Sequence, residues 1–367
     1  MKIMLYAYVD ENIGDDLFID LICRRYKNVE FYLYVPEKYI NNYRYIKNLK
    51  CIPYKEINKN LDRINRWFFK GKLTSKLYFN KMYKLDKKWV KNMDAQLWLG
   101  GSQFVETEDW KNVIDYKLKQ QKLKDIPFFS ISATIGPYSS REYENAIQKV
   151  VAGYDHIVLR DKISYELLQE RNNASYTYDM VFNIESKCRE KKKEVCISVI
   201  DMYGRTSEKL AQIYEEFIGK ITKRYIALGY KINFLSLCEN QKDKYAIERI
   251  VRDNNLENVR IFSYTNNLEE IINVIDNASI MIGTRYHSIV VALKFGLKVL
   301  PISYESKTDN LMIMMEKNTI KIENITNIEV DNLDKYMVIL DEKEKEHISK
   351  SAELQYKDID IWMETEE

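Results

Sequence analysis

Three observations predict a two-domain α/β protein with a parallel sheet in each domain. The chain has 367 residues, more than one typical domain contains. Apolar runs of strand length alternate with segments of helical period over most of the chain. Several of the expected strands stop at glycine or polar residues just before a helix. This order favours parallel sheets covered by helices on both faces, two Rossmann-like domains facing a cleft, with ligands bound at the carboxyl ends of the strands.

The first half of the chain supplies the elements of an N-terminal domain, which we place at residues 1–184. We expect strands at residues 3–9, 31–35, 95–99, 127–133 and 156–159, and helices at residues 17–26 and 164–171. The strand at 95–99 is expected to end at Gly100-Gly101. Residues 55–93 are basic and aromatic, and we expect them to be helical.

The second half shows the alternation more cleanly. A charged linker is expected at residues 185–194, a C-terminal α/β domain at 195–340 and a helical tail at 341–367. Within this domain we expect strands at 195–200, 231–237, 259–262, 279–282 and 298–302. The expected helices lie at 207–228, 242–254, 268–277 and 286–295.

Composition argues against several classes of protein. Lysine and arginine number 57 against 55 acidic residues, so nothing predicts nucleic acid as a partner. Five widely spaced cysteines without a CxxC pair favour neither a disulfide framework nor a metal site. The first apolar run is short and soon acidic, unlike a signal peptide, and no run reaches the roughly 18 apolar residues of a membrane helix. We expect a cytoplasmic protein, at most peripherally attached to the inner face of the membrane.

The segment Gly283–Ser288 carries the clearest chemical signal. It joins the end of an expected strand to the first turn of an expected helix, where backbone N–H groups favour an anion. Arg285 can hold a carboxylate or phosphate through two hydrogen bonds. His287, one of three histidines, can transfer a proton near neutral pH. The same residues also suit a structural role, in which Arg285 pairs with an acidic neighbour and His287 caps the helix.

The loop after the first strand has a similar position. Asn12 can bind sugar hydroxyls through its amide, and Gly14 allows a close backbone approach to a ligand. Asp15 or Asp16 can cap the next helix. A helix cap with no further function remains an alternative for this loop.

Three more positions follow expected strands. The amides of Gly100 and Gly101 can reach a ligand, although an ordinary turn would use the same glycines. Arg160 would point into the same cleft, or form a surface ion pair. Lys307 would add positive charge to the site, or be one of many surface lysines.

In this order the segments resemble the polysaccharide pyruvyltransferase family. The resemblance extends over about residues 1–320, and Gly283–Ser288 is its most specific part. The matching residues are Asn12, Gly14, Asp15, Asp16, Gly100, Gly101, Arg160, Asp161, Ser164, Asp179, Gly283, Arg285, His287, Tyr304 and Lys307.

The resemblance implies a fold similar to GT-B glycosyltransferases and a pyruvyl transfer from phosphoenolpyruvate onto two hydroxyls of a sugar, without a cofactor. Arg285 and Arg160 would hold the donor's carboxylate or phosphate, and His287 would be the acid. Asp15 or Asp16 would be the base. The remaining expected substrate contacts are Asn12, Gly14, Gly100, Gly101, Ser288 and Lys307. The acceptor would be a surface or cell-wall glycan precursor, free or lipid-linked, bound by the N-terminal domain. The sugar and the oligomeric state are left open.

Two other functions are compatible with the same sequence. A GT-B glycosyltransferase with a nucleotide-sugar donor would have the same βα order, with Glu305 as the one nearby candidate for binding ribose hydroxyls. A catalytically inactive scaffold of envelope assembly could dock to a membrane or partner through the basic and aromatic stretch Arg66–Lys91.

Overall fold

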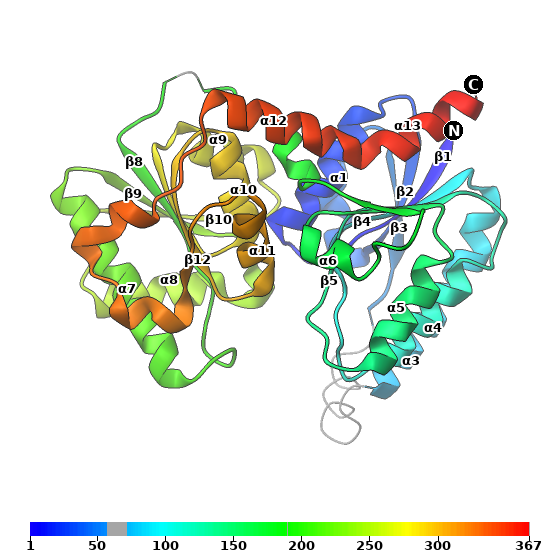
Figure 1. Ribbon diagram of the computed structural model, residues 1–367, viewed down its shortest axis with the longest axis horizontal. Coiled ribbons are helices and arrows are strands. Elements are labelled where there is room, and N and C mark those ends of the chain that lie inside the picture. Colours follow the sequence, from blue (N-terminus) through cyan, green and yellow to red (C-terminus); the bar gives the residue numbers. More distant parts are fainter. Residues whose placement is uncertain (57–71, 189, 367) are drawn as a thin grey trace. The chain divides into compact units, whose positions relative to one another are not determined.

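The computed structural model describes residues 1–56, 72–188 and 190–366, and the chain forms two compact units. Unit 1 comprises Met1–Val9, Phe18–Met180 and Glu353–Glu367; unit 2 comprises Asp10–Leu17 and Val181–Ala352. Residues 10–17, which follow the first strand, are therefore counted with the C-terminal unit. Each unit is described by itself below (Figure 1).

Unit 1 contains a seven-stranded parallel sheet in the order β3-β2-β1-β4-β5-β6-β7. Its strands are β1 (Lys2–Tyr6), β2 (Glu30–Pro36), β3 (Leu49–Tyr54), β4 (Ala95–Phe104), β5 (Phe128–Ile135), β6 (His156–Leu159) and β7 (Ala174–Tyr176). Its α-helices are α1 (Ile13–Arg25, whose first residues belong to unit 2), α3 (Lys72–Trp89), α4 (Trp110–Gln120), α5 (Arg141–Val151), α6 (Lys162–Glu166) and α13 (Lys357–Glu366). Every residue of β5 is buried, as expected for a parallel strand covered on both faces.

Unit 2 contains a six-stranded parallel sheet in the order β10-β9-β8-β11-β12-β13. Its strands are β8 (Glu194–Ser198), β9 (Lys231–Ser236), β10 (Val259–Ser263), β11 (Ile280–Gly283), β12 (Lys298–Ser303) and β13 (Ile320–Lys321). Its α-helices are α7 (Glu208–Ala227), α8 (Asp243–Asp253), α9 (Leu268–Asn277), α10 (Tyr286–Lys294), α11 (Ser306–Met314) and α12 (Glu342–Glu353).

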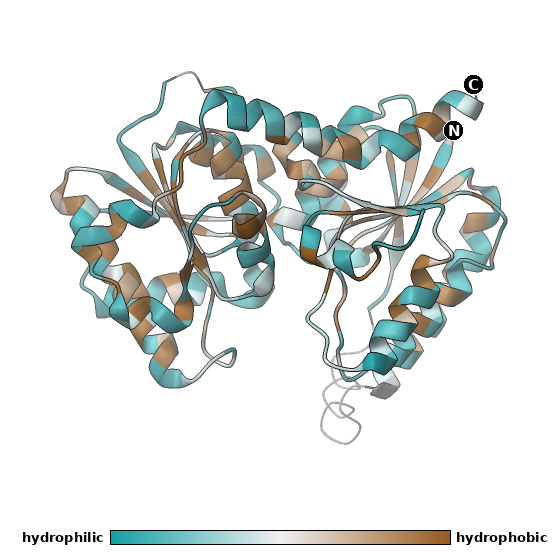
Figure 2. Cartoon of the chain, viewed as in Figure 1, coloured by the Kyte–Doolittle hydropathy of each residue, from teal (hydrophilic) through white to brown (hydrophobic). Residues whose placement is uncertain are grey.

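Short 3-10 helices connect some of these elements. They are η1 (Glu37–Tyr43), η2 (Val90–Asn92), η3 (Met180–Asn183), η4 (Glu239–Gln241), η5 (Ile322–Asn327), η6 (Val330–Tyr336) and η7 (Leu354–Tyr356). In both units the central strands are the most apolar part, while the outward faces of the helices are hydrophilic (Figure 2). The cores are thus formed between sheet and helices, as the apolar runs of the sequence predict.

The two sheets are built in the same way. Successive strands are added first on one side of the first strand and then on its other side. In unit 2 the chain runs outward from β8 through β9 to β10, and then crosses to the other side of β8 with β11. In unit 1 the same crossing places β4 beside β1. The crevice at such a switch point, at the carboxyl ends of the strands, is where doubly wound sheets bind ligands.

The sequence located most strands but missed several elements. The expected strand at 156–159 and the expected helix at 268–277 have the bounds observed for β6 and α9. The helices α4, α5 and α11 and the strands β3, β7 and β13 were not predicted. Of the stretch expected to be helical, residues 55–93, the part from Lys72 to Trp89 forms α3. Residues 57–71 lie outside the described part of the chain, and with them the start of the stretch Arg66–Lys91.

Candidate active site

The site in unit 2 is formed by the loops that follow four neighbouring strands. Because β9, β8, β11 and β12 are parallel and adjacent, their carboxyl ends meet at one edge of the sheet. In chain order these loops, with the first residues of the helices that follow, contribute Arg205, Gln241, Asp243, Arg285, His287 and Lys307. The switch point between β8 and β11 lies within this set.

Arg285 is held by a buried carboxylate. Its Nε lies 3.0 Å from Oδ2 of Asp243, and its Nη2 donates to Oδ1 of the same group. Asp243 is fully buried and also accepts hydrogen bonds from the backbone N–H groups of Leu237 and Cys238. Burial raises the pKa of Asp243, while the Arg285 guanidinium acts in the opposite direction. Arg285 thus does pair with an acidic neighbour, and this pairing fixes the plane of its guanidinium.

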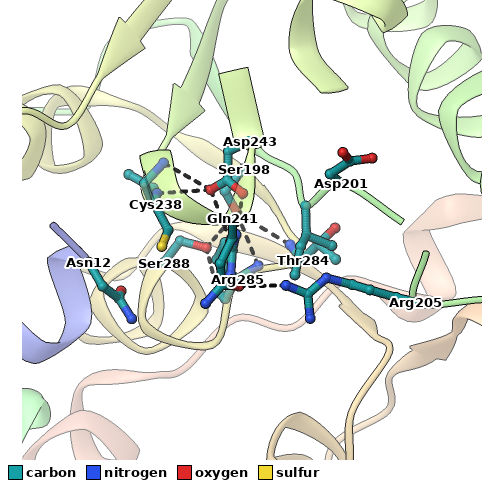
Figure 3. A network of polar contacts seen from close by, with 12 residues as sticks. Asn12, Ser198, Asp201, Arg205, Cys238, Gln241, Asp243, Thr284, Arg285 and Ser288 are labelled. Atoms are coloured by element: carbon teal, nitrogen blue, oxygen red, sulfur yellow. Dashed lines mark hydrogen bonds and ion pairs between the residues drawn. The ribbon is translucent and has the colours of Figure 1, made fainter. Parts of the chain in front are cut away.

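Gln241 joins Arg285 to a second arginine (Figure 3). Its Oε1 accepts hydrogen bonds from Nη1 of Arg285 at 2.6 Å and from Nη2 of Arg205 at 2.9 Å. Arg205 belongs to the loop after β8 and is exposed. Two guanidinium groups therefore meet at one neutral amide oxygen.

Buried hydroxyl groups support the start of α10. The hydroxyls of Ser198 and Ser288 lie 2.6 Å apart, and that of Ser288 also donates to the carbonyl of Arg285. Ser198 Oγ accepts from the backbone N–H groups of Thr284 and Arg285, and the Thr284 hydroxyl bonds to that of Tyr214. Ser288, expected as a substrate contact, is buried within this network. Helix α10 begins directly after Arg285. The backbone N–H groups of its first turn have no acceptor within the helix.

The loop after β1 lies against the first turn of α10. The N–H of Ile13 donates to the carbonyl of Leu237 at 3.2 Å, and Asn12 forms an isolated antiparallel bridge with Cys238. A Cβ atom placed on Gly14 would lie 1.9 Å from Nδ1 of His287. Because any Cβ would collide there, the imidazole occupies space that only glycine leaves open. The two segments singled out from the sequence thus meet inside unit 2.

Within this loop the side chains bond to one another. Asn12 Oδ1 accepts from the N–H of Gly14 at 3.1 Å, and its Nδ2 donates to Asp15 at 2.8 Å. Asn12 therefore caps α1, and the expectation that Asp15 or Asp16 does so is wrong; both lie in the first turn. Asp16 is buried and accepts a hydrogen bond from the Tyr264 hydroxyl. Asp15 is partly exposed.

The loop after β12 carries an ion pair. Nζ of Lys307 lies 2.8 Å from Oε2 of Glu305. Burial alone would raise the pKa of Glu305, but the Lys307 ammonium brings it below its ordinary value. The carboxylate that the nucleotide-sugar alternative would use for ribose hydroxyls is therefore engaged with a lysine.

Comparison with known sequences places these motifs in a family. The sequence profile described as polysaccharide pyruvyl transferase matches residues 12–306. The chain belongs to the polysaccharide pyruvyl transferase family. It is also similar to the amylovoran biosynthesis protein AmsJ of Erwinia amylovora, with 22% identity over 255 residues, which are 61% of this chain and 60% of that protein. The chain thus spans about 60% of the length of this curated relative.

Solved structures share the fold of this pyruvyl transferase family member. The UDP-GlcNAc 2-epimerase of Neisseria meningitidis has a TM-score of 0.63 at 11% identity, covering 98% of this chain and 99% of that one. The corresponding enzyme of Methanocaldococcus jannaschii has a TM-score of 0.54 at 12% identity, covering 95% and 99%. Arabidopsis thaliana UGT89C1 has a TM-score of 0.52 at 9% identity, covering 96% and 94%. At such identities the likeness shows the fold alone, and it confirms the predicted similarity to GT-B proteins.

Arg160, the other arginine singled out from the sequence, belongs to unit 1. Its side chain is buried, with Nη1 3.0 Å from Oδ2 of the fully buried Asp179. Its Nε donates to the Thr134 hydroxyl at 2.6 Å. A surface ion pair was one expectation for Arg160; the pair is instead buried, so its loss would leave a carboxylate in the interior.

Gly100 and Gly101 also belong to unit 1, but they do not end a strand. Strand β4 continues through them to Phe104, which corrects the prediction of a turn. Both have positive φ, +45° and +77°, and the pairing of β4 with β5 changes register just after Gly101. A Cβ on Gly100 would lie 2.1 Å from the ring of Phe18. Gly100 thus allows the strand to bend while a core aromatic ring packs against it.

Sequence reasoning missed three residues of the candidate site, Arg205, Gln241 and Asp243, and also Tyr264, which bonds to Asp16 from the loop after β10. They carry no motif, and each becomes visible only through its partner. The sequence holds a partial indication for Asp243. This acidic residue begins the helix that follows β9, so it lies at the same edge of the sheet as Arg285, the edge formed by the carboxyl ends of the strands. Arg205 lies in a loop whose course the sequence does not define.

Among the described residues, no helix is both long and apolar enough to cross a bilayer. In the same residues, no group of three or more histidine, cysteine, aspartate or glutamate side chains is arranged to hold a metal ion.

Proposed function

We propose that this family member transfers a pyruvyl group from phosphoenolpyruvate to two hydroxyls of a sugar in a polysaccharide or its precursor, forming a cyclic ketal. The observation that carries the proposal is the contact of Gly14 with His287 beside Arg285. The proposal is supported by two family-like motifs from opposite ends of the matched region, which lie in contact beside the switch point of the unit 2 sheet. Such a site suits an anionic substrate.

The donor requires cations, because phosphoenolpyruvate carries both a phosphate and a carboxylate. Each nitrogen of Arg285 makes one hydrogen bond, to Asp243 or Gln241. A guanidinium has five N–H donors, so two remain to bind an anionic oxygen in a fixed orientation. The first turn of α10 contributes backbone N–H groups at the same point. Lys307 lies in the first turn of α11, after the neighbouring strand β12, and we assign it a supporting role in charge balance.

His287 is the proposed acid. Protonation of the donor's methylene carbon gives a methyl group and an electron-poor carbon bearing the phosphate. A sugar hydroxyl attacks that carbon and loses its proton to the base, which balances the proton given to the methylene carbon. The carbon–oxygen bond to phosphate then breaks, and a second hydroxyl attacks the same carbon and gives its proton to the departing phosphate, which closes the ketal. The products are the ketal and inorganic phosphate. A positioned acid contributes about 10²–10⁴-fold to such a reaction.

Asp15 is the better placed of the two proposed bases. Asp16 is buried and bonded to Tyr264, so its carboxylate is already engaged. Asp15 is partly exposed and is oriented by the Asn12 amide. Asn12, by contrast, uses its amide inside the loop, and we now assign it to positioning this loop.

The acceptor is proposed to be a glycan of the cell envelope, free or lipid-linked, bound by unit 1. Family membership supports a polysaccharide acceptor, and the similar AmsJ is named for the biosynthesis of one, amylovoran. A lipid-linked acceptor would bring the protein to the inner face of the membrane. The proposed donor chemistry uses no cofactor, and residues 55–93 are proposed to distinguish the sugar.

The proposal is tested by incubating the protein with phosphoenolpyruvate and envelope oligosaccharides. We expect release of inorganic phosphate together with an acceptor that gains the mass of one pyruvyl ketal. The nucleotide-sugar alternative predicts a different ligand. Thermal stabilisation by a nucleoside diphosphate, without stabilisation by phosphoenolpyruvate, would favour that alternative.

A further inference from the structure

The cations of the site differ in whether a carboxylate already neutralises them. Arg285 is paired with Asp243, and Lys307 with Glu305. Within the described part of the chain, the only hydrogen bond of the Arg205 side chain goes to the uncharged Gln241. The two cations that the sequence singles out in unit 2 are thus both ion-paired within the chain. Arg205 also acts electrostatically on Glu305, but that carboxylate already pairs with Lys307. The three cations therefore share two carboxylates, Asp243 and Glu305.

The loop that carries Arg205 is an ordered turn. The N–H groups of Arg205 and Thr206 both donate to the carbonyl of Met202, and Gly204 supplies a φ of +80°. The acidic residue of this loop, Asp201, is bonded to Arg249 at 2.7 Å, and Arg249 also pairs with Glu215. Asp201 is therefore engaged away from Arg205, although both belong to the same loop.

The position of Arg205 brings two like charges together. Its guanidinium and that of Arg285 both donate to Oε1 of Gln241, and Asp243, the carboxylate that pairs with Arg285, balances only one of the two charges. Two guanidinium groups that share one acceptor atom repel one another. An anionic oxygen bound by both guanidinium groups would offset that repulsion and gain charge-assisted hydrogen bonds. The arrangement is that of a binding site for an anion.

We propose that Arg205, with Arg285 and the bridging Gln241, binds an anionic oxygen of the pyruvyl donor. This assignment rests on the proposed function and adds a substrate-binding residue that no motif of the sequence indicates. The location supports the donor as the ligand, because Arg205 follows β8 and Arg285 follows β11, the two strands of the switch point. A sugar acceptor without charge would gain little from a second guanidinium.

The experiment compares Arg205→Gln with Arg252→Gln in the full-length protein. Arg252 is also exposed in unit 2, but it pairs with Asp253 at the end of α8. A helix that follows a parallel strand runs back along the sheet, so this control removes the same charge at the opposite edge. Binding of phosphoenolpyruvate and of inorganic phosphate is measured by calorimetry, and thermal stability without ligand is recorded for each variant.

We expect Arg205→Gln to weaken binding of phosphoenolpyruvate about tenfold, the effect typical of one charge-assisted hydrogen bond. Thermal stability without ligand should not fall, because the side chain is exposed and its removal relieves the repulsion with Arg285, and Arg252→Gln should bind like the wild type. If Arg205→Gln binds phosphoenolpyruvate as the wild type does, the assignment of Arg205 is wrong while the proposed function stands. If the wild type itself binds neither phosphoenolpyruvate nor phosphate, both are overturned.

Discussion

The α-carbon of Gly14 packs directly against the imidazole of His287. A Cβ atom at position 14 would lie 1.9 Å from Nδ1, 2.5 Å from Cε1 and 2.8 Å from Cγ of that ring. The two residues come from separate motifs, one after β1 and one in α10. Their contact means that the orientation of the proposed acid depends on a residue far away in the sequence.

Gly14→Ala should therefore impair catalysis more than binding. The added methyl group forces the His287 ring to move, and a displacement of about 1 Å can cost about 10²-fold in rate. We expect a fall of that order in kcat, measured by phosphate release at saturating phosphoenolpyruvate. Gly153→Ala is the matched control, since its Cβ would meet the end of the flexible Gln121 side chain in unit 1. Equal turnover of Gly14→Ala and wild type would contradict the proposed role of this contact.

His287→Gln should retain donor binding and lose turnover. Glutamine keeps a polar side chain of similar length but cannot act as the acid, so we expect kcat to fall by about 10²–10⁴-fold. The Kd for phosphoenolpyruvate, measured by calorimetry, should stay close to that of the wild type. His347→Gln, an exposed position on α12, serves as the control. Near-normal turnover of His287→Gln would exclude the assignment as acid.

The sequence predicted more of the fold than of the site's contacts. Strands buried on both faces, such as β6, are marked by continuous apolar runs, and strand ends followed by glycine or arginine were located well. By contrast, β4 continues through Gly100 and Gly101 because a bend of the strand accommodates Phe18. The partner of Arg285 could not be predicted, because Asp243 reaches it through the adjacency of β8, β9 and β11, which no local pattern encodes.

Arg160 provides a test between a structural and a donor-binding role. Arg160→Met removes the guanidinium that pairs with the buried carboxylate of Asp179, and breaking such a buried pair costs about 3–5 kcal/mol of the free energy of unfolding. We expect a matching loss of stability in urea denaturation. The double variant Arg160→Met with Asp179→Asn should recover part of it, because the buried carboxylate charge of Asp179 is then removed together with its partner. Unchanged stability of the single variant, together with weaker binding of phosphoenolpyruvate, would instead establish Arg160 as a donor clamp.

The burial of Lys117 should make the free energy of unfolding depend on pH, with lower stability at neutral pH than at high pH. The side chain is 3% exposed, its Nζ lies 3.5 Å from the centre of the Trp98 ring, and within the described residues this Nζ has no hydrogen-bond partner. Burial lowers the pKa of Lys117 from 10.5 to about 7. As pH falls from 10.5 to 7, the unfolded chain binds a proton that the folded chain does not, so folding loses stability over this range.

Lys117→Met should therefore stabilise the protein at neutral pH and not at high pH. The shift corresponds to a gain on the order of 3–5 kcal/mol at pH 7 or below. The cation–π contact with Trp98, worth up to about 2 kcal/mol, reduces this gain only where the folded lysine is protonated. The gain should shrink towards pH 10, as measured by urea denaturation at pH 6, 8 and 10. Lys119→Met, a half-exposed position on the same helix, should show no such trend. A gain that is constant with pH would mean that the buried ammonium is not the cause.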